Sequence, residues 1–423
     1  MTDGTSRRVS ITAMSLLACW MYYLYTYIVR VEPCVLVDDL MREFSITSSV
    51  LGMVASSAYI PYVAMQIPCG IITDKLGVKV MVACGCALCA LGVFIFGAAK
   101  SVFFLQVGRF LIGLASASAF LCCGKVAAEY FSKDKYALLM GLAMCMGCIG
   151  GISGTAPTAF LVERCGWRGA TYILAAVGAV LTLMALFFIK KREKSPAESG
   201  SRPQLLKGIK ILSKQPKLWL AGLYGAIMYL PLSALAELWI VPYTGVRFGV
   251  DTETASLSSI LLFIGFAVGS AVSPWVADKI NSYKKTLIGS SVLCVSTSAA
   301  ALYVGALGFG GSLAMLFLSG TAAGASTLVF AISYHMAPHE YSGSSAGFTN
   351  ALIMSSGIIF QPILGYLIDF YKQSDVRDAT GAAVSGYYSV DVYQETFMVL
   401  IYVFVAALIM TFFINEIKAR KEK

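Results

Sequence analysis

The sequence has few charged residues and almost no histidine. Only 13% of its 423 residues are charged, whereas a soluble domain carries about a quarter. Its two histidines are His335 and His339, and it lacks the G-x-x-x-x-G-K pattern of a nucleotide-binding loop. The low charge excludes an ordinary soluble protein. The missing nucleotide-binding loop predicts that ATP does not drive the protein. We also expect that it is not an enzyme and uses no cofactor.

The twelve cysteines do not form a disulfide or metal framework. Eleven lie in the first half of the chain, mostly inside apolar runs. The pairs Cys86/Cys89 and Cys145/Cys148 have C-x-x-C spacing, but no cluster of further ligands accompanies them. The sequence therefore predicts cysteines that pack between helices, and no metal site.

Apolar residues make up 58% of the chain and occur in blocks of about twenty, separated by short polar joints. This pattern predicts an all-α membrane protein with twelve transmembrane helices. The expected spans are approximately residues 11–36, 46–71, 79–99, 102–126, 137–161, 169–189, 218–242, 255–276, 285–306, 312–335, 343–367 and 395–414.

The net charge of +9 could suggest nucleic-acid binding, but the basic residues concentrate in alternate joints. That asymmetry is typical of membrane proteins, whose cytoplasmic loops are enriched in lysine and arginine. We predict an integral protein of a bacterial inner (plasma) membrane, with both termini in the cytoplasm and no nucleic-acid partner. We also expect a monomer.

The longest basic joint and an internal repeat divide the chain in two. Residues 190–217 form a predicted cytoplasmic linker between six-helix bundles at 1–189 and 218–423. Asp74-Lys75 follows the second span, and Asp278-Lys279 follows the eighth. In the second copy Pro274 stands in place of Gly70, and Asn281 in place of Gly77. Two parallel six-helix halves are the plan of one transporter fold, whose substrate site lies between the halves.

The loop after the second span resembles that of the major facilitator superfamily. The matching residues are Gly70, Asp74, Lys75, Gly77 and Lys79, and the helix-four pattern begins at Arg109. The resemblance implies alternating access, with this loop and its copy at Asp278 and Lys279 forming a conformational gate. In the outward-open state the loop would bridge to the C-terminal half. It also implies a functional or ion-pairing role for Arg109, including in proton coupling.

Arg30 is the strongest candidate for binding substrate. It lies in the first span, and Tyr23, Tyr27, Arg30 and Cys34 share one helix face at spacings of four, three and four. An arginine at membrane depth normally faces a cavity or a partner. A guanidinium can hold a carboxylate or phosphate through two parallel hydrogen bonds. The alternatives are a structural ion pair or a side chain that reaches water at the interface.

Glu237 is the counterpart in the seventh span, where Tyr229 shares its face and Pro231 can loosen the helix. Its carboxylate could carry a coupling proton, hold a substrate amine, or pair with Arg30. Asn350 and Gln361, in the eleventh span, are further candidates for hydrogen bonds to substrate. Bonding between helices is the equally plausible role for both amides.

Two more specific resemblances bear on the class of substrate. Tyr22-Tyr23 ahead of Arg30 resembles the first helix of the organophosphate:phosphate antiporter family, which implies an anion site. That family has a second arginine in helix seven, where this chain has Leu232 and Ser233. A weaker similarity to lysosomal dipeptide transporters implies a zwitterion.

The function we predict is secondary transport of a small anionic or zwitterionic solute, such as an organic acid, amino acid or short peptide, by proton-coupled symport. The alternatives are an organophosphate-type anion exchanger, efflux of drugs or metabolites, and a transporter-like membrane sensor.

Overall fold

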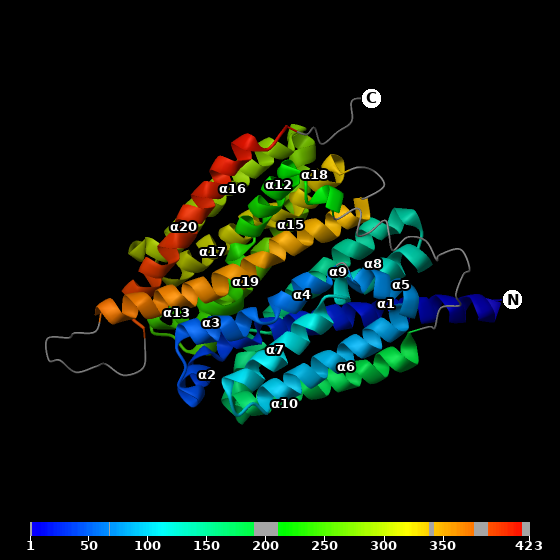
Figure 1. Ribbon diagram of the computed structural model, residues 1–423, viewed down its shortest axis with the longest axis horizontal. Helices are drawn as coiled ribbons and strands as arrows, with labels where there is room; N and C mark the ends of the chain where they lie inside the picture. The colour runs from blue at the N-terminus through cyan, green and yellow to red at the C-terminus, as the bar shows by residue number, and fades with distance from the viewer. Residues whose placement is uncertain (1, 67, 190–209, 338–341, 376–387, 417–423) are drawn as a thin grey trace.

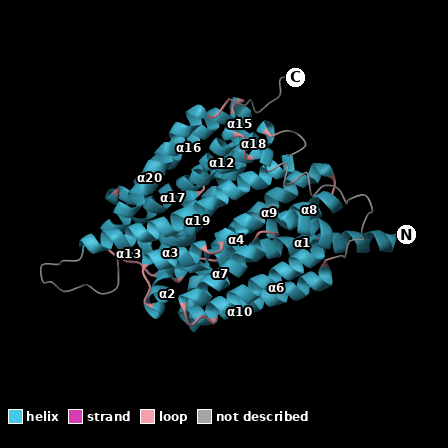
Figure 2. Ribbon diagram, in the orientation of Figure 1, coloured by secondary structure: helices cyan, strands magenta, loops and turns pink. Residues whose placement is uncertain are grey.

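The computed structural model describes residues 2–66, 68–189, 210–337, 342–375 and 388–416, and every regular element in these ranges is helical (Figure 2). The first half contains α1 Thr2–Val31, η1 Glu32–Val35, α2 Val37–Phe44, α3 Ser48–Ser56, α4 Tyr59–Met65, α5 Pro68–Leu76, α6 Val78–Gly97, α7 Val102–Ser116, α8 Ala119–Tyr130, α9 Lys133–Ser153 and α10 Ala156–Phe188. The second contains α12 Pro216–Met228, η3 Pro231–Trp239, α13 Ile240–Phe248, α14 Thr252–Ala255, α15 Leu257–Ile280, α16 Tyr283–Tyr303, η4 Gly305–Leu307, α17 Gly308–Ala323, η5 Gly324–Thr327, α18 Leu328–Met336, α19 Ser342–Asp375 and α20 Val390–Phe413.

Twelve crossings can be assigned to these helices. Ten helical stretches among the described residues are long and apolar enough to span a membrane. One of them, Leu138–Phe188, has 51 residues and would be about 75 Å long, more than twice the hydrocarbon thickness. It divides at Gly166, whose φ of 70° is not helical, and so supplies two crossings. Counting both parts of this stretch, together with the 30-residue α1, which is not among the ten, gives twelve segments, the number that the sequence predicts.

Several predicted spans are interrupted rather than continuous. The second is divided into α3, α4 and α5, the fourth into α7 and α8, and the tenth into α17, η5 and α18. The seventh changes from α-helix to π-helix between Pro231 and Trp239 before α13 begins. Period-3.6 patterning does not reveal such changes, because the apolar residues continue through each interruption.

The helices gather into two groups, with α6, α7 and α10 at one side of the molecule and α12, α16 and α20 at the other (Figure 1). The helices α1, α4, α15 and α19 lie between these groups. We call the end where α10 finishes and α12 begins the linker side, and the opposite end the α2 side. The predicted linker lies mainly in residues 190–209, outside the described ranges, so its boundaries stay a prediction.

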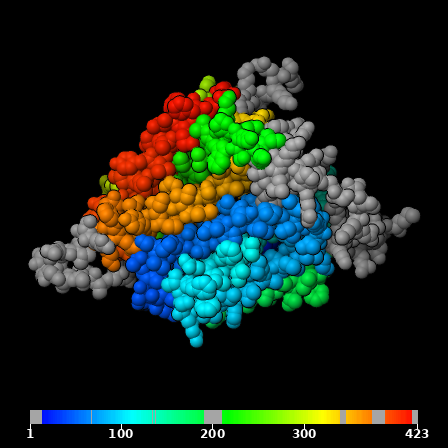
Figure 3. Space-filling model, in the orientation of Figure 1, coloured from blue at the N-terminus to red at the C-terminus, as the bar shows by residue number. Residues whose placement is uncertain are grey.

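The two halves are packed tightly against each other on the α2 side, as the surface view also suggests (Figure 3). A Cβ added to Gly365 of α19 would lie 2.2 Å from the carbonyl oxygen of Ser48 in α3. One added to Gly52 of α3 would lie 2.5 Å from the carbonyl oxygen of Gln361. Only glycine permits this backbone approach, so these two positions set how closely the halves meet.

A carboxylate from the second half closes this contact by binding the first turn of α3. Asp369 of α19 accepts hydrogen bonds from the backbone N–H of Ser48 at 3.0 Å and of Ser49 at 2.8 Å. The Ser49 hydroxyl donates to it at 2.5 Å, and the Tyr388 hydroxyl at 3.2 Å. Burial raises the pKa of Tyr388 to about 12, so this hydroxyl keeps its proton and remains a donor. The positive end of the α3 dipole adds to the attraction.

We expect Asp369→Asn to loosen the α2 side, because an amide offers one acceptor where the carboxylate offers two. The loss of about 1–2 kcal/mol would populate conformations opened on this side roughly ten-fold more. The measurement is labelling of a cysteine introduced at buried Ser56 by a membrane-impermeant maleimide added from the α2 side.

The matched control is Asp251→Asn. Asp251 also accepts from a helix N-terminus, at 2.8 Å from the backbone nitrogen of Thr254, but within one half. The Asp251→Asn substitution should therefore leave labelling of the cysteine at position 56 unchanged. Equal labelling in the Asp369→Asn variant and its parent would contradict a closing role for Asp369.

Candidate functional site

The candidate site is organised around an ion pair between the halves. Arg30, in the last turn of α1, and Glu237, in η3, are both buried, with 6% and 1% of their side-chain surfaces exposed. The Nε of Arg30 lies 3.5 Å from Oε1 of Glu237. The hydroxyl of Tyr59 in α4 donates to Oε2 of the same carboxylate. The two charges predicted from separate helices therefore meet, and a tyrosine that the sequence analysis missed joins them.

Aromatic rings surround the guanidinium. Its Cζ lies 3.9 Å from the ring centroid of Tyr27, at cation–π distance, and 5.8 Å from that of Tyr59. Tyr23 packs edge-on against Tyr27, and their hydroxyls are 3.4 Å apart. Tyr229 is buried on the other half and packs edge-on against Phe266. The predicted aromatic stripe on α1 therefore lies beside Arg30.

The ion pair leaves hydrogen-bonding capacity unused. Within the described part of the chain, Nε and Nη2 of Arg30 and Oε1 of Glu237 are buried without a hydrogen-bond partner. The 3.5 Å contact is electrostatic but long for a hydrogen bond. A guanidinium has five N–H donors, and leaving buried donors unmade is costly. The two Arg30 nitrogens can therefore donate to a ligand oxygen, and Oε1 of Glu237 can accept from a ligand N–H or O–H.

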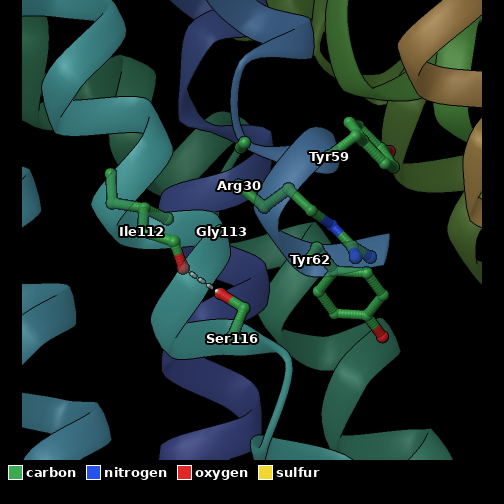
Figure 4. Close-up of a pocket in the computed structure, with 7 residues that line it drawn as sticks. Arg30, Tyr59, Tyr62, Ile112, Gly113 and Ser116 are labelled. Carbon is green, nitrogen blue, oxygen red and sulfur yellow. Dashed lines mark hydrogen bonds between the residues drawn. The ribbon is translucent and has the colours of Figure 1, made fainter. Parts of the chain in front are cut away.

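A small cavity adjoins Arg30 and is bordered by α4 and α7. Tyr59, Tyr62, Gly113 and Ser116 help to line it, and the guanidinium extends between the two tyrosine rings (Figure 4). The Ser116 hydroxyl donates to the carbonyl of Ile112 at 2.7 Å. Tyr59 and Tyr62 have helical i, i+3 spacing around Pro61, the one sequence signal that could have identified them.

The two predicted amides from helix eleven have different surroundings. Asn350 interacts with the hydroxyl of Tyr62, across the boundary between the halves. Gln361 uses its Nε2 to donate to the backbone carbonyl of Ser233, at 2.7 Å, within the second half. Of the two, Asn350 adjoins Tyr62, which lines the Arg30 cavity, whereas Gln361 contacts the backbone of the segment that carries Glu237.

Arg109 lies next to the site but is directed at the backbone. Its Nη1 donates to the carbonyl of Val29 at 2.7 Å and its Nη2 to that of Arg30 at 3.0 Å. It therefore fixes the end of α1 from α7. Nearby, Glu32 is 1% exposed and accepts a hydrogen bond from Thr171 at 2.7 Å. Glu32 is a buried carboxylate that the sequence analysis did not single out, although an acidic residue two positions after Arg30 was visible.

The predicted gate residues lie on the linker side, away from Arg30. Asp74 is exposed, and its carboxylate pairs with Lys125 of α8 at 2.5 Å. Lys75 is exposed and Lys79 is half-buried, and Gly70 faces Leu121 of α8. The carboxylate therefore bonds within its own half in this conformation, and a bridge to the other half stays a prediction for the opposite one.

The two copies of the loop differ in backbone conformation. Gly77, directly before α6, has a φ of 80° and a ψ of 161°, a region that is essentially restricted to glycine. Asn281, which ends α15, has a φ of 51° and a ψ of 40°, in the left-handed helical region that asparagine tolerates. Asparagine can therefore stand in the second copy because the backbone there differs from that at Gly77. Asp278 and Lys279 are exposed, and Lys279 lies 5.0 Å from the ring centroid of Trp275.

Among the residues that the structure describes, no three His, Cys, Asp or Glu side chains are grouped so that they could hold a metal ion.

Comparison with known proteins gives the family. The model of the Major Facilitator Superfamily matches residues 11–371. The chain belongs to this superfamily. It is 26% identical to the probable sulfoacetate transporter SauU of Cupriavidus necator, over 87% of this chain and 90% of that protein. It is 22% identical to the hexuronate transporter of Bacillus subtilis, over 81% and 85% of the two chains.

The fold agrees with that assignment. The crystal structure of a bacterial homologue of the human lysosomal transporter Spinster, in an inward-facing and unoccupied conformation, superposes with a TM-score of 0.77. It has 13% sequence identity and covers 96% of this chain and 97% of its own. The predicted superfamily and all-α transmembrane fold are confirmed. This superfamily member is an integral membrane secondary transporter and not an enzyme.

We expect Tyr59→Phe to weaken the connection between the halves without disturbing packing. The ring would still pack on Gly357, where an added Cβ would lie 2.5 Å from it, but the hydrogen bond to Glu237 would be lost. Hydrogen bonds between membrane helices contribute about 0.6–1.7 kcal/mol. A lower apparent melting temperature of the purified transporter would show this loss.

The control for this prediction is Tyr62→Phe, which changes the same cavity but not the hydroxyl bonded to Glu237. In a Glu237→Gln background the effect of Tyr59→Phe should shrink, whereas that of Tyr62→Phe should be retained. Additive effects of Tyr59→Phe and Glu237→Gln would contradict the contact.

Proposed function

We propose that this transporter carries a small organic anion together with a proton, with the anion bound at Arg30. One observation carries the proposal: Arg30 is buried between the halves, with Nε and Nη2 free of hydrogen bonds within the described residues. A carboxylate, sulfonate or similar oxyanion can accept from both nitrogens in parallel. The two relatives are named for sulfoacetate and hexuronate, which both bear a carboxylate.

The surroundings of Arg30 suit a small solute with a carbon skeleton. Tyr27 and Tyr59 present ring faces and edges near the guanidinium, and Tyr62 and Ser116 border the cavity. Rings pack against carbon atoms while hydroxyls offer hydrogen bonds to polar substituents. The cavity is small in this conformation, so a substrate would require the halves to separate on one side.

Glu237 supplies a reason for coupling transport to protons. Ionised Glu237 competes with an anionic substrate for the positive charge of Arg30 at 3.5 Å. Protonation would remove that competition, because a neutral acid no longer attracts the guanidinium. A proton on Glu237 and an anion on Arg30 would then bind together, and the buried site would carry no additional net charge. This linkage favours symport.

The conformation fits one half of an alternating-access cycle. The halves are joined on the α2 side through Asp369 and the close glycine contacts, whereas Asp74 on the linker side bonds within its own half. If the linker side is cytoplasmic, as the distribution of basic residues predicts, this is an inward-facing arrangement. Opening outward would require release of Asp369, and Asp74 would become available to bridge the halves.

A zwitterion is the second candidate. Glu237 Oε1 is also buried without a hydrogen-bond partner in the described residues, so it could accept from a substrate amine while Arg30 binds the carboxylate. Phosphate-ester exchange is less favoured, because Leu232 and Ser233 in helix seven provide no second guanidinium. The two candidates would be separated by comparing how well two groups of compounds inhibit uptake of a labelled substrate: anions without an amine, and amino acids or dipeptides.

We expect Arg30→Ala to abolish uptake of a carboxylated anion, because the fixed positive charge would be lost. The measurement is uptake of labelled sulfoacetate and glucuronate into proteoliposomes. Arg30→Lys is the matched variant: it keeps the charge but not the planar fork, and the half-saturating concentration should rise roughly 30-fold or more. Uptake by Arg30→Ala equal to that of the parent would remove Arg30 from the site.

We expect Glu237→Gln to abolish the response of transport to an imposed pH gradient, because the amide cannot exchange a proton. Uptake driven by the substrate gradient alone should persist. Glu253→Gln, an exposed carboxylate in α14, is the control and should retain the full response. A normal response of Glu237→Gln would assign the coupling proton to another group.

A further inference from the structure

The segment that carries Glu237 is a π-helix, and its residues are all buried. Between Pro231 and Trp239 the chain is wound more widely than in an α-helix. The backbone N–H of Ile240 donates to the carbonyl of Leu235, five residues earlier. Pro231 has no backbone N–H, which interrupts the ladder where this segment begins.

Side chains from two other helices bind carbonyls within the segment. Nε2 of Gln361 in α19 donates to the carbonyl of Ser233 at 2.7 Å. The hydroxyl of Ser259 in α15 donates to the carbonyl of Ala236, the residue immediately before Glu237, at 2.8 Å. These two bonds hold the backbone of the segment at Ser233 and at Ala236. The carboxylate of Glu237 is directed at the first half of the chain.

The winding of this segment decides where Glu237 points. Each residue of an α-helix turns the chain by about 100°, and each residue of the more widely wound π-helix turns it by less, so conversion of the segment to α-helix would rotate Glu237 relative to Pro231. Glu237 would then leave Arg30 and Tyr59. Because a π turn is rarely the preferred local winding, external bonds are needed to retain it.

We propose that Gln361 and Ser259 are positioning residues, which hold helix seven in the π conformation and thereby direct Glu237 at Arg30. They act through the backbone, so of the two roles that the sequence left open for Gln361, substrate contact and bonding between helices, this inference assigns the second. The inference rests on the proposed function only in that Arg30 and Glu237 form the working site. The geometry it concerns can be measured without any substrate.

The test is a double-mutant cycle on the purified full-length transporter in detergent, with no ligand added. Arg30→Gln, Glu237→Gln and their combination give the coupling between the two side chains, read as the non-additive part of the shifts in apparent melting temperature. The cycle is repeated in Gln361→Met, which has similar length but no donor, and in Ser259→Ala. Ser259→Thr is the matched control, because it retains the hydroxyl.

We expect coupling between Arg30 and Glu237 in the parent and in Ser259→Thr, and its loss in Gln361→Met and Ser259→Ala. A role in packing alone would lower the melting temperature but leave the coupling unchanged, and that outcome would overturn the inference. Absence of coupling in the parent would overturn it as well. Since uptake is not measured, failure of the proposed substrate or proton role would appear separately, in the proteoliposome experiments.

Discussion

The ion pair between Arg30 and Glu237 is the interaction on which the site depends. It joins a helix of the first half to a helix of the second, deep in the protein, and Tyr59 strengthens it from α4. A buried ion pair costs much of its attraction in desolvation, so it is a poor source of stability by itself. In the transport that we propose its value is different: both charges would change partners, with substrate at Arg30 and a proton at Glu237.

The contacts between the halves on the α2 side hold the site closed on that side of the protein. Gly52 and Gly365 allow the backbones of α3 and α19 to approach, and Asp369 binds the first turn of α3. Asp74 is a carboxylate near the opposite end, bonded to Lys125 in its own half. A carboxylate that can bind a helix terminus offers a reversible contact whose strength depends on close geometry. In the cycle that we propose, separation on the α2 side would be offset by such a contact of Asp74 on the linker side.

The interruptions of the helices determine which groups face the site. Glu237 lies in a π-helical segment, Tyr59 begins α4 after a break in the second span, and Arg109 binds the carbonyls that end α1. Regular α-helices would direct these side chains differently. The functional groups thus occupy positions where the backbone departs from regular winding, and neighbouring side chains such as Gln361 and Ser259 supply the missing hydrogen-bond partners.

The sequence by itself determined the membrane fold and the superfamily, because the fold depends on apolar runs that a bilayer requires and the superfamily on a loop motif that is local in sequence. It also singled out Arg30 and Glu237 as candidates, since a charge inside an apolar span normally faces a cavity or a partner. Only the tertiary structure decided that these two are partners. Tyr59 and Asp369 could not be chosen from sequence, because their importance comes from contacts across more than 170 residues of chain. The same holds for Gln361, whose amide could equally have met substrate until packing placed it against the backbone of helix seven.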